Sequence, residues 1–167
     1  MAVGGGMRQE SLNEICFTNF LHLALIRLLL EEARNTPLNR KITRARIVVD
    51  SRDSVFHPLF YALQEMFGCY LPPLLQLDFY RGAGYPYSQE LSKALSDIHV
   101  QESIIYASLY NNTFMVHARK DTRRFCNKEL KKLFSDNPKA RQAFDRLIQA
   151  LKSLVIRIEE WPGVPSE

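Results

Sequence analysis

The chain has 167 residues, a mass of 19.4 kDa and a formal net charge of +4, from 22 basic and 18 acidic residues. Hydrophobic residues make up 46% of it and charged residues 24%, which is an ordinary globular composition and excludes a disordered chain, a collagen-like repeat and a disulfide scaffold. This length suits one complete hydrophobic core, so we expect a single domain over residues 1–167.

Cysteine usage and apolar runs bear on the compartment. The chain has three cysteines, which are far apart and form no C-x-x-C pair: Cys16, Cys69 and Cys126. This pattern argues against a disulfide framework or a structural zinc site, so we expect a cytoplasmic protein. Residues 1–10 contain three glycines and no signal-peptide core, which indicates a flexible N-terminus. The longest apolar run, residues 21–30, includes a histidine and an arginine and is too short to span a membrane.

The first predicted element is a long helix. Ser11 and Glu14 have the S-x-x-E spacing of a capping box, and apolar residues recur behind them at helical spacing. The breaker Asn35-Thr36-Pro37 should end the helix, which we therefore place within residues 11–35, from about Leu12 to Ala33. Its apolar face is wide, which indicates packing against a large core or a partner subunit.

A short strand and a helix are predicted next. Residues Arg46-Ile47-Val48-Val49 favour a strand, and the segment from Asp50 to Ser54 has turn-forming residues that can cap a helix. The helix is expected over Pro58–Phe67, because proline is favoured at a first helical position and Gly68 follows as a stop. The spacing of its apolar residues predicts that Met66 is buried.

The middle of the chain contains a clear turn followed by a helix. A short buried helix is expected after Pro72-Pro73, and the segment Gly82–Tyr87 then places two glycines and a proline within six residues. Ser88 is a favourable N-cap, and Glu90 suits the first turn of a helix. The apolar stripe behind them predicts a helix over Gln89–His99.

A hairpin and two helices complete the prediction. The segments Ile104–Tyr110 and Thr113–His117 are rich in strand-forming residues and flank Asn111-Asn112, which suits a two-residue turn because asparagine tolerates positive φ. Two C-terminal helices are expected over residues 121–160. The first is Thr122–Phe134, and the second begins at Asn137-Pro138 and continues its apolar stripe to Ile158.

The order helix, helix, glycine-rich turn, helix, hairpin is that of a winged helix. We therefore predict a mainly helical α+β fold. Its winged-helix-like centre, helices plus one β-hairpin over residues 58–118, would be flanked by long N- and C-terminal helices. The helix 89–99 would take the recognition position, and Asn111-Asn112 would form the tip of the wing.

Residues 79–98, FYRGAGYPYSQELSKALSDI, resemble a segment of the Panacea family, the antitoxin- and phage-associated domain related to SocA. That family has an aromatic and glycine-containing turn, a Pro-Tyr-Ser-like element and a helix of the form Leu-x-x-Ala-Leu-x-x-Leu. The resemblance is confined to this segment, and its helical half would suit any winged helix. The sequence departs from the family at Tyr85, where a glycine is expected before Pro86.

The net charge is unevenly distributed along the chain. Residues 36–49 contain four basic and no acidic residues, and residues 119–132 contain seven basic and two acidic ones. Residues 50–118, which include the predicted winged helix, contain seven acidic and three basic residues. The predicted recognition helix is therefore a poor surface for a groove lined with phosphates.

The two basic clusters are candidates for contact with a nucleic acid or an acidic protein partner, or they are solvated helix faces and loops. The candidate contact residues are Arg40, Lys41, Arg44, Arg46, Arg119, Lys120, Arg123, Arg124, Lys128, Lys131 and Lys132. Three aromatic residues near the glycine-rich turn are candidates for stacking on a ligand or base, or else pack the turn onto the core. They are Tyr80, Tyr85 and Tyr87.

Signals for catalysis are weak. Asp50 and Asp53 follow a predicted strand, where carboxylates can hold Mg²⁺ for phosphoester cleavage, but they equally suit a turn that caps the next helix. The four histidines form no H-x-H or H-x-x-x-H pair, and no phosphate-binding glycine loop is present in the sequence. We assign no catalytic residue, metal ligand or cofactor, and we favour a protein that is not an enzyme.

The leading interpretation is a non-enzymatic regulatory or interaction protein that acts through protein contacts. A homodimer is a further expectation, because the flanking helices have wide apolar faces. One alternative is a winged-helix DNA-binding transcriptional regulator that uses the basic helix within residues 119–132. The other is a Mg²⁺-dependent phosphoesterase or nuclease around Asp50 and Asp53.

Overall fold

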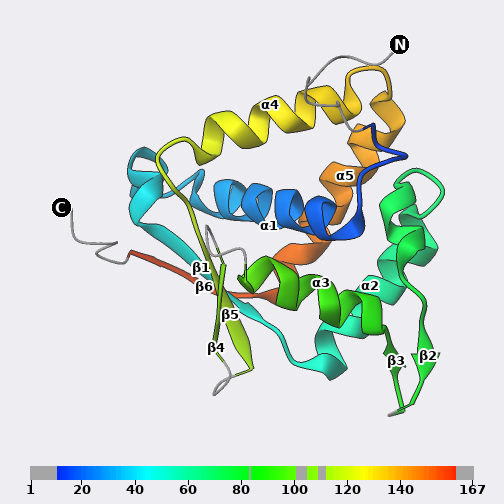
Figure 1. Ribbon diagram of the computed structural model, residues 1–167. Coiled ribbons are helices and arrows are strands. Elements are labelled where there is room, and N and C mark those ends of the chain that lie inside the picture. Colours follow the sequence, from blue (N-terminus) through cyan, green and yellow to red (C-terminus); the bar gives the residue numbers. More distant parts are fainter. Residues whose placement is uncertain (1–10, 83, 101–104, 109–111, 161–167) are drawn as a thin grey trace.

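The computed structural model describes residues 11–82, 84–100, 105–108 and 112–160 (Figure 1). Over these residues the fold is α+β and mainly helical, as predicted. Four strands form an antiparallel sheet in the order β4 (Ile105–Ser108), β5 (Thr113–His117), β1 (Ala45–Asp50), β6 (Val155–Glu160). Strands β2 (Tyr80–Arg81) and β3 (Pro86–Tyr87) form a separate two-stranded ribbon. The expected flexible N-terminus, residues 1–10, and Asn111 of the expected turn lie outside the described residues. No helix among the described residues is long and apolar enough to cross a membrane.

Helix α1 (Phe17–Ala33) lies in the middle of the structure and is its most buried helix (Figure 1). Eleven of its 17 residues are buried. It packs against α3 (Gln89–Val100), α4 (Thr122–Phe134) and α5 (Pro138–Leu151), and against strands β1 and β5 of the sheet. The wide apolar face seen in the sequence is therefore covered by the chain itself, and α1 is the centre of the core where a flanking helix was expected.

The prediction that this helix occupies residues 11–35 is wrong at its start. Ser11 and Glu14 do form half of a capping box, since the N–H of Ser11 donates to Oε1 of Glu14 at 3.4 Å, but they close a separate turn. The helix begins at Phe17, whose N–H donates to Oε1 of Gln76 at 2.8 Å. A side chain from a distant segment thus caps α1, and no local pattern could show this.

The sheet is built on β1 (Ala45–Asp50), which confirms the predicted strand. It pairs antiparallel with β5 (Thr113–His117) on one side and with β6 (Val155–Glu160) on the other. Ile47 is opposite Val116 and Ile158, and Ile47 and Val116 belong to the same hydrophobic core cluster as the buried residues of α1.

The predicted hairpin is confirmed. Strand β4 (Ile105–Ser108) pairs antiparallel with β5, with Ser108 opposite Thr113. Asn112 has a φ of 51°, in the left-handed region that asparagine tolerates. The hairpin is not isolated, because β5 also pairs with β1 and so joins it to the central sheet.

The prediction of helix throughout residues 121–160 is wrong at the C-terminal end. Helix α5 ends at Leu151, and a short 3-10 helix leads into β6. The spacing of Leu151, Leu154, Val155 and Ile158 suits a helix, but a short apolar run rich in β-branched residues suits a strand as well. Pairing with β1 supplies backbone hydrogen bonds and decides in favour of the strand.

The elements in the middle of the chain agree more closely with the prediction from the sequence. Helix α2 (Asp53–Phe67) starts earlier than predicted, and Pro58 lies inside it. This position costs one backbone hydrogen bond without ending the helix. The glycine-rich turn connects β2 (Tyr80–Arg81) to β3 (Pro86–Tyr87), and Oγ of Ser88 accepts the N–H of Leu91 at 3.2 Å as the predicted N-cap of α3.

Candidate functional site

The two basic segments of the sequence lie side by side in the structure. The first forms a 3-10 helix, η1 (Pro37–Arg44), and the second forms α4 and the turn before it. Nη2 of Arg123 donates to the carbonyl O of Asn39 at 2.8 Å and to its Oδ1 at 2.7 Å. In Figure 1 the start of α4 accordingly lies next to η1. The contact joins residues 84 positions apart, so no pattern of neighbouring residues could predict it.

The candidate cations of this region are mostly exposed. On α4, Arg124, Lys128 and Lys131 follow one another at the i, i+4, i+7 spacing of a single helix face. We use the term basic region for the exposed or half-buried cations of η1, α4 and the turn between β5 and α4. These are Arg40, Lys41, Arg44, Arg119, Lys120, Arg123, Arg124, Lys128 and Lys131.

Arg46 and Lys132 of the candidate cations form ion pairs with carboxylates of the described residues. Nε of Arg46, on β1, lies 2.6 Å from Oε1 of Glu159 on β6. Nζ of Lys132 lies 3.5 Å from Oε2 of Glu129, one turn earlier on α4. We therefore place Arg46 and Lys132 outside the basic region.

Cations from both basic clusters influence the pKa of His117. His117 is buried and lies opposite Arg46 in the sheet register. Burial, together with the positive charges of Arg119 and Arg46, lowers the pKa of His117 to about 4. Two cations from the two different clusters thus act on the same imidazole.

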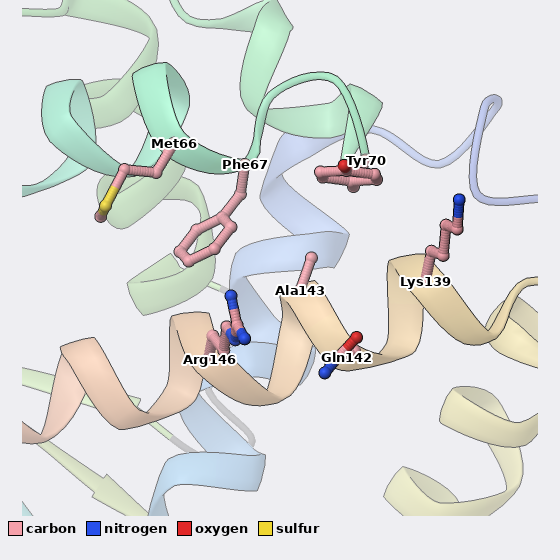
Figure 2. A pocket seen from close by; sticks show the side chains of 7 residues that line it. All are labelled: Met66, Phe67, Tyr70, Lys139, Gln142, Ala143 and Arg146. Carbon is pink, nitrogen blue, oxygen red and sulfur yellow. The ribbon is translucent and has the colours of Figure 1, made fainter.

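A second surface lies between the end of α2 and α5, where the structure has a hollow of about 240 Å³ (Figure 2). Its lining residues are Met66, Phe67, Tyr70, Lys139, Gln142, Ala143 and Arg146. We call this hollow the α2–α5 groove. Met66 is 54% exposed and Tyr70 is 45% exposed, so the prediction that Met66 is buried is wrong.

The α2–α5 groove has an apolar side and a basic side. Figure 2 shows Met66 and Phe67 reaching from α2, and Tyr70 from the segment after it, while Lys139 and Arg146 project from α5. Neither cation forms an ion pair with any other residue in the part of the chain that the structure describes. The sequence did not point to this site, because Met66 and Phe67 fit the core spacing of their helix.

A buried histidine stands at the glycine-rich turn. Nδ1 of His57, on α2, accepts the backbone N–H of Ser88 at 3.0 Å, so the proton of the neutral ring is on Nε2. Nε2 is 3.3 Å from Oγ of Ser92 and 3.6 Å from Oδ1 of Asp53. With its proton on Nε2, this imidazole donates to Ser92 and is in the wrong tautomer to deprotonate it. The pair therefore holds the turn and is not an activated nucleophile.

The same contact explains one of the candidate tyrosines. The ring of Tyr87 stacks on His57 with centroids 4.2 Å apart, and its hydroxyl lies 2.8 Å from Oγ of Ser92. Tyr87 thus packs the turn onto the core. Tyr80 makes an edge contact with Tyr87 and is 48% exposed, and Tyr85 is half-buried.

The two candidate metal-binding carboxylates have separate partners. Both oxygens of Asp50 bind the guanidinium of Arg52, at distances from 2.7 to 3.2 Å, and Oδ1 also accepts the backbone N–H of Arg52. These contacts lower the pKa of Asp50. Asp53 instead begins α2 and faces His57. In the described parts of the chain, no group of three or more His, Cys, Asp and Glu residues is arranged to hold a metal ion.

No protein-family model, curated protein or solved structure matches this chain. The resemblance of residues 79–98 to the Panacea family therefore stays a prediction.

Proposed function

We propose that this chain is a non-enzymatic interaction protein that binds an acidic, partly apolar segment of a partner protein in the α2–α5 groove. The observation that carries this proposal is the pairing of exposed Met66 and Tyr70 with the unpaired cations Lys139 and Arg146 across one hollow. Single exposed apolar residues are ordinary, whereas methionine, tyrosine and arginine gathered around a hollow are typical of protein interfaces.

The charge of the groove indicates which segment it would bind. Among the residues that the structure describes, no carboxylate lines it, and its two cations are seven residues apart on α5, which is about 10.5 Å along a helix axis. A partner segment with two carboxylates at that separation would reach both cations. An apolar side chain between those carboxylates would cover Met66 and Tyr70, because the thioether and the aromatic ring adapt to varied apolar shapes.

The test is binding of a fluorescent peptide of alternating leucine and glutamate, measured by anisotropy. We expect the double variant Lys139→Glu, Arg146→Glu to bind it about tenfold more weakly, because both ion pairs with the carboxylates of the peptide are lost. The matched control is Lys128→Glu, Lys131→Glu, which reverses two exposed charges on α4 and should leave binding unchanged. Equal weakening in both variants, or equal binding of a leucine–lysine peptide, would contradict the proposal.

A DNA-binding regulator is the second candidate. It is supported by the contact of Arg123 with Asn39, which brings the two basic segments together, and by the winged-helix-like order of α2, α3, β4 and β5. The exposed residues of α3 include Glu90 and Lys93 and give it little positive charge, so phosphate contacts would come from the basic region.

For this candidate the roles of the two double variants are exchanged. Affinity for duplex DNA should fall linearly with the logarithm of salt concentration, because bound cations release counterions from the phosphates. Lys128→Glu, Lys131→Glu should weaken DNA binding about tenfold at low salt, while Lys139→Glu, Arg146→Glu changes it little. Absence of binding at low salt would remove this candidate. A homodimer stays a prediction, which light scattering tests against the monomer mass of 19.4 kDa.

A further inference from the structure

A pocket of about 250 Å³ lies between α1, η1 and the start of α4. Its lining differs from that of the α2–α5 groove, because it is almost entirely polar. It consists of Arg27, Leu30, Glu31, Arg34, Asn39, Arg123 and Asn127. Three guanidinium groups, two amides and one carboxylate thus surround a space where the two basic segments meet.

The guanidinium groups approach the pocket from two sides. Arg27 is on α1 and Arg34 is the C-cap residue that follows it, and both face Glu31, at 2.7 Å from Nη2 of Arg27 and 3.9 Å from Nη1 of Arg34. Arg123 comes from α4, and its Nη2 is held by the backbone and side chain of Asn39. The positions of Arg27 and Arg123 are therefore fixed by contacts within the protein. This reduces the side-chain conformational entropy that is lost when a ligand binds.

Donors remain on these groups after the internal contacts. A guanidinium has five N–H donors, and the described contacts of Arg27 and Arg123 each involve only the Nη2 atom. Each guanidinium therefore has further N–H donors with which it can bind an anion, and one guanidinium edge can bind two oxygens at once.

The charge and shape of the pocket favour one chemical class. Three positive charges and one negative charge leave a surplus of two, which matches the charge of about −1.5 to −2 on a phosphate monoester at neutral pH. A carboxylate offers one planar pair of oxygens and meets one guanidinium edge. A phosphoryl group has three oxygens in tetrahedral arrangement and can meet guanidinium groups on two sides.

We propose that this pocket binds a single phosphoryl group, held by Arg27 and Arg123 and closed by the exposed Arg34. The proposal concerns a different site from the α2–α5 groove and does not rest on the function proposed for it. The phosphoryl group has two sources with the same chemistry, which are a free phosphorylated small molecule and the 5′-phosphate of a nucleic-acid strand.

Calorimetry on the full chain distinguishes these sources. The probes are inorganic phosphate, adenosine monophosphate and one oligonucleotide prepared with a 5′-phosphate or a 5′-hydroxyl. Binding of phosphate or the nucleotide indicates the small-molecule source, and a preference of about tenfold for the 5′-phosphorylated strand indicates the strand end. If neither small probe binds and the two oligonucleotides bind equally, the pocket proposal is overturned.

Two variants connect the binding to this pocket. Arg123→Gln should weaken phosphoryl binding about tenfold, and the matched control Arg81→Gln, which changes an exposed arginine of β2 outside both the pocket and the basic region, should leave it unchanged. Equal effects of the two variants would overturn the proposal.

A third variant covers the case in which Arg123→Gln disturbs the fold. Glu31→Gln removes the carboxylate that repels the ligand, and we expect it to strengthen phosphoryl binding roughly threefold at low salt. A merely structural role of Glu31 predicts weaker binding, because Arg27 would lose its partner, and that result would contradict the proposal.

Discussion

Gln76 and Phe17, which are 59 residues apart, are joined at the first turn of α1. Oε1 of Gln76 accepts the N–H of Phe17 at 2.8 Å, and its Nε2 donates to the carbonyl O of Ile15 at 2.9 Å. One amide therefore satisfies two backbone groups on either side of Cys16, whose own side chain makes no capping hydrogen bond. The most buried helix of the fold thus depends for its start on the η2 segment (Pro72–Gln76).

We expect Gln76→Ala to lower the free energy of unfolding by about 1 kcal/mol, because a helix cap and a second backbone hydrogen bond are lost together. Urea denaturation measures the change. The control is Gln149→Ala on the exposed face of α5, which should stay within about 0.5 kcal/mol of the parent protein. Equal effects of the two variants would show that the contact does not stabilise the start of α1.

NMR spectroscopy can test the predicted tautomer of His57, in which the neutral ring carries its proton on Nε2. Because Nδ1 accepts the backbone N–H of Ser88, the neutral ring should show the pattern of a proton on Nε2 in a long-range ¹H–¹⁵N spectrum at pH 7.5. A proton on Nδ1 is the opposing result, and it would make Ser92 a candidate nucleophile. Ser92→Ala should change stability by less than about 1 kcal/mol, because His57 keeps its bond to Ser88.

Stability should fall as the pH is lowered from 6.5 to 4. The pKa of His117 is lowered to about 4 in the folded protein, from an ordinary value of 6.5. Between these values the unfolded chain takes up a proton that the folded protein does not, so the free energy of unfolding falls by up to about 3 kcal/mol. Burial also lowers the pKa values of His22 and His57 from 6.5. Both histidines therefore add to the loss of stability below pH 6.5.

Urea denaturation between pH 7.5 and pH 4 measures this loss. The variant His117→Gln should flatten the dependence, because it removes the largest single contribution. The acidic residues Asp50, Glu90 and Glu159 also have lowered pKa values, but their contribution is lost only below the ordinary values of 3.8 for Asp and 4.5 for Glu, which is at the acid end of this range and beyond it. A dependence unchanged in His117→Gln would contradict the assignment.

Gly68 should not tolerate a side chain. It has ordinary helical φ and ψ, but an added Cβ would lie 2.6 Å from the carbonyl O of Gln64 and 2.8 Å from Cδ2 of Leu75. We expect Gly68→Ala to lower the free energy of unfolding by about 2 kcal/mol, because backbone must move to relieve the overlap. Gly82→Ala is the control, since its nearest neighbour is the exposed ring of Tyr80 at 3.0 Å, which can turn away. A thermal shift that is equal for both variants would contradict this reasoning.

Local signals in the sequence located several elements correctly. Helix α4 has the predicted bounds, Thr122–Phe134, and α5 begins at Pro138 with Asn137 as its cap, whose Oδ1 accepts the N–H of Ala140 at 3.0 Å. Ser88 caps α3, and Asn112, which precedes β5 of the hairpin, has the positive φ that asparagine tolerates. These elements were predictable because capping, glycine stops and positive φ involve residues within four positions of each other.

Contacts between distant residues were not predictable in this way. The apolar spacing of Val155 and Ile158 suits both helix and strand, and the decision came from pairing with β1, more than a hundred residues earlier. The groove beside Met66 is formed by residues of both α2 and α5. How these two helices pack against each other cannot be predicted from the spacing of apolar residues along either one.

The class of fold, the uneven charge and the segments that carry it follow from the amino-acid sequence, because each is a property of neighbouring residues. Two further features result from contacts between distant segments: α1 is the centre of the core, and η1 and α4 meet at Asn39 and Arg123. Burial of apolar area is non-directional, so it favours a compact arrangement without specifying which surfaces end up together. That choice depends on the specific hydrogen bonds and strand pairings between distant segments.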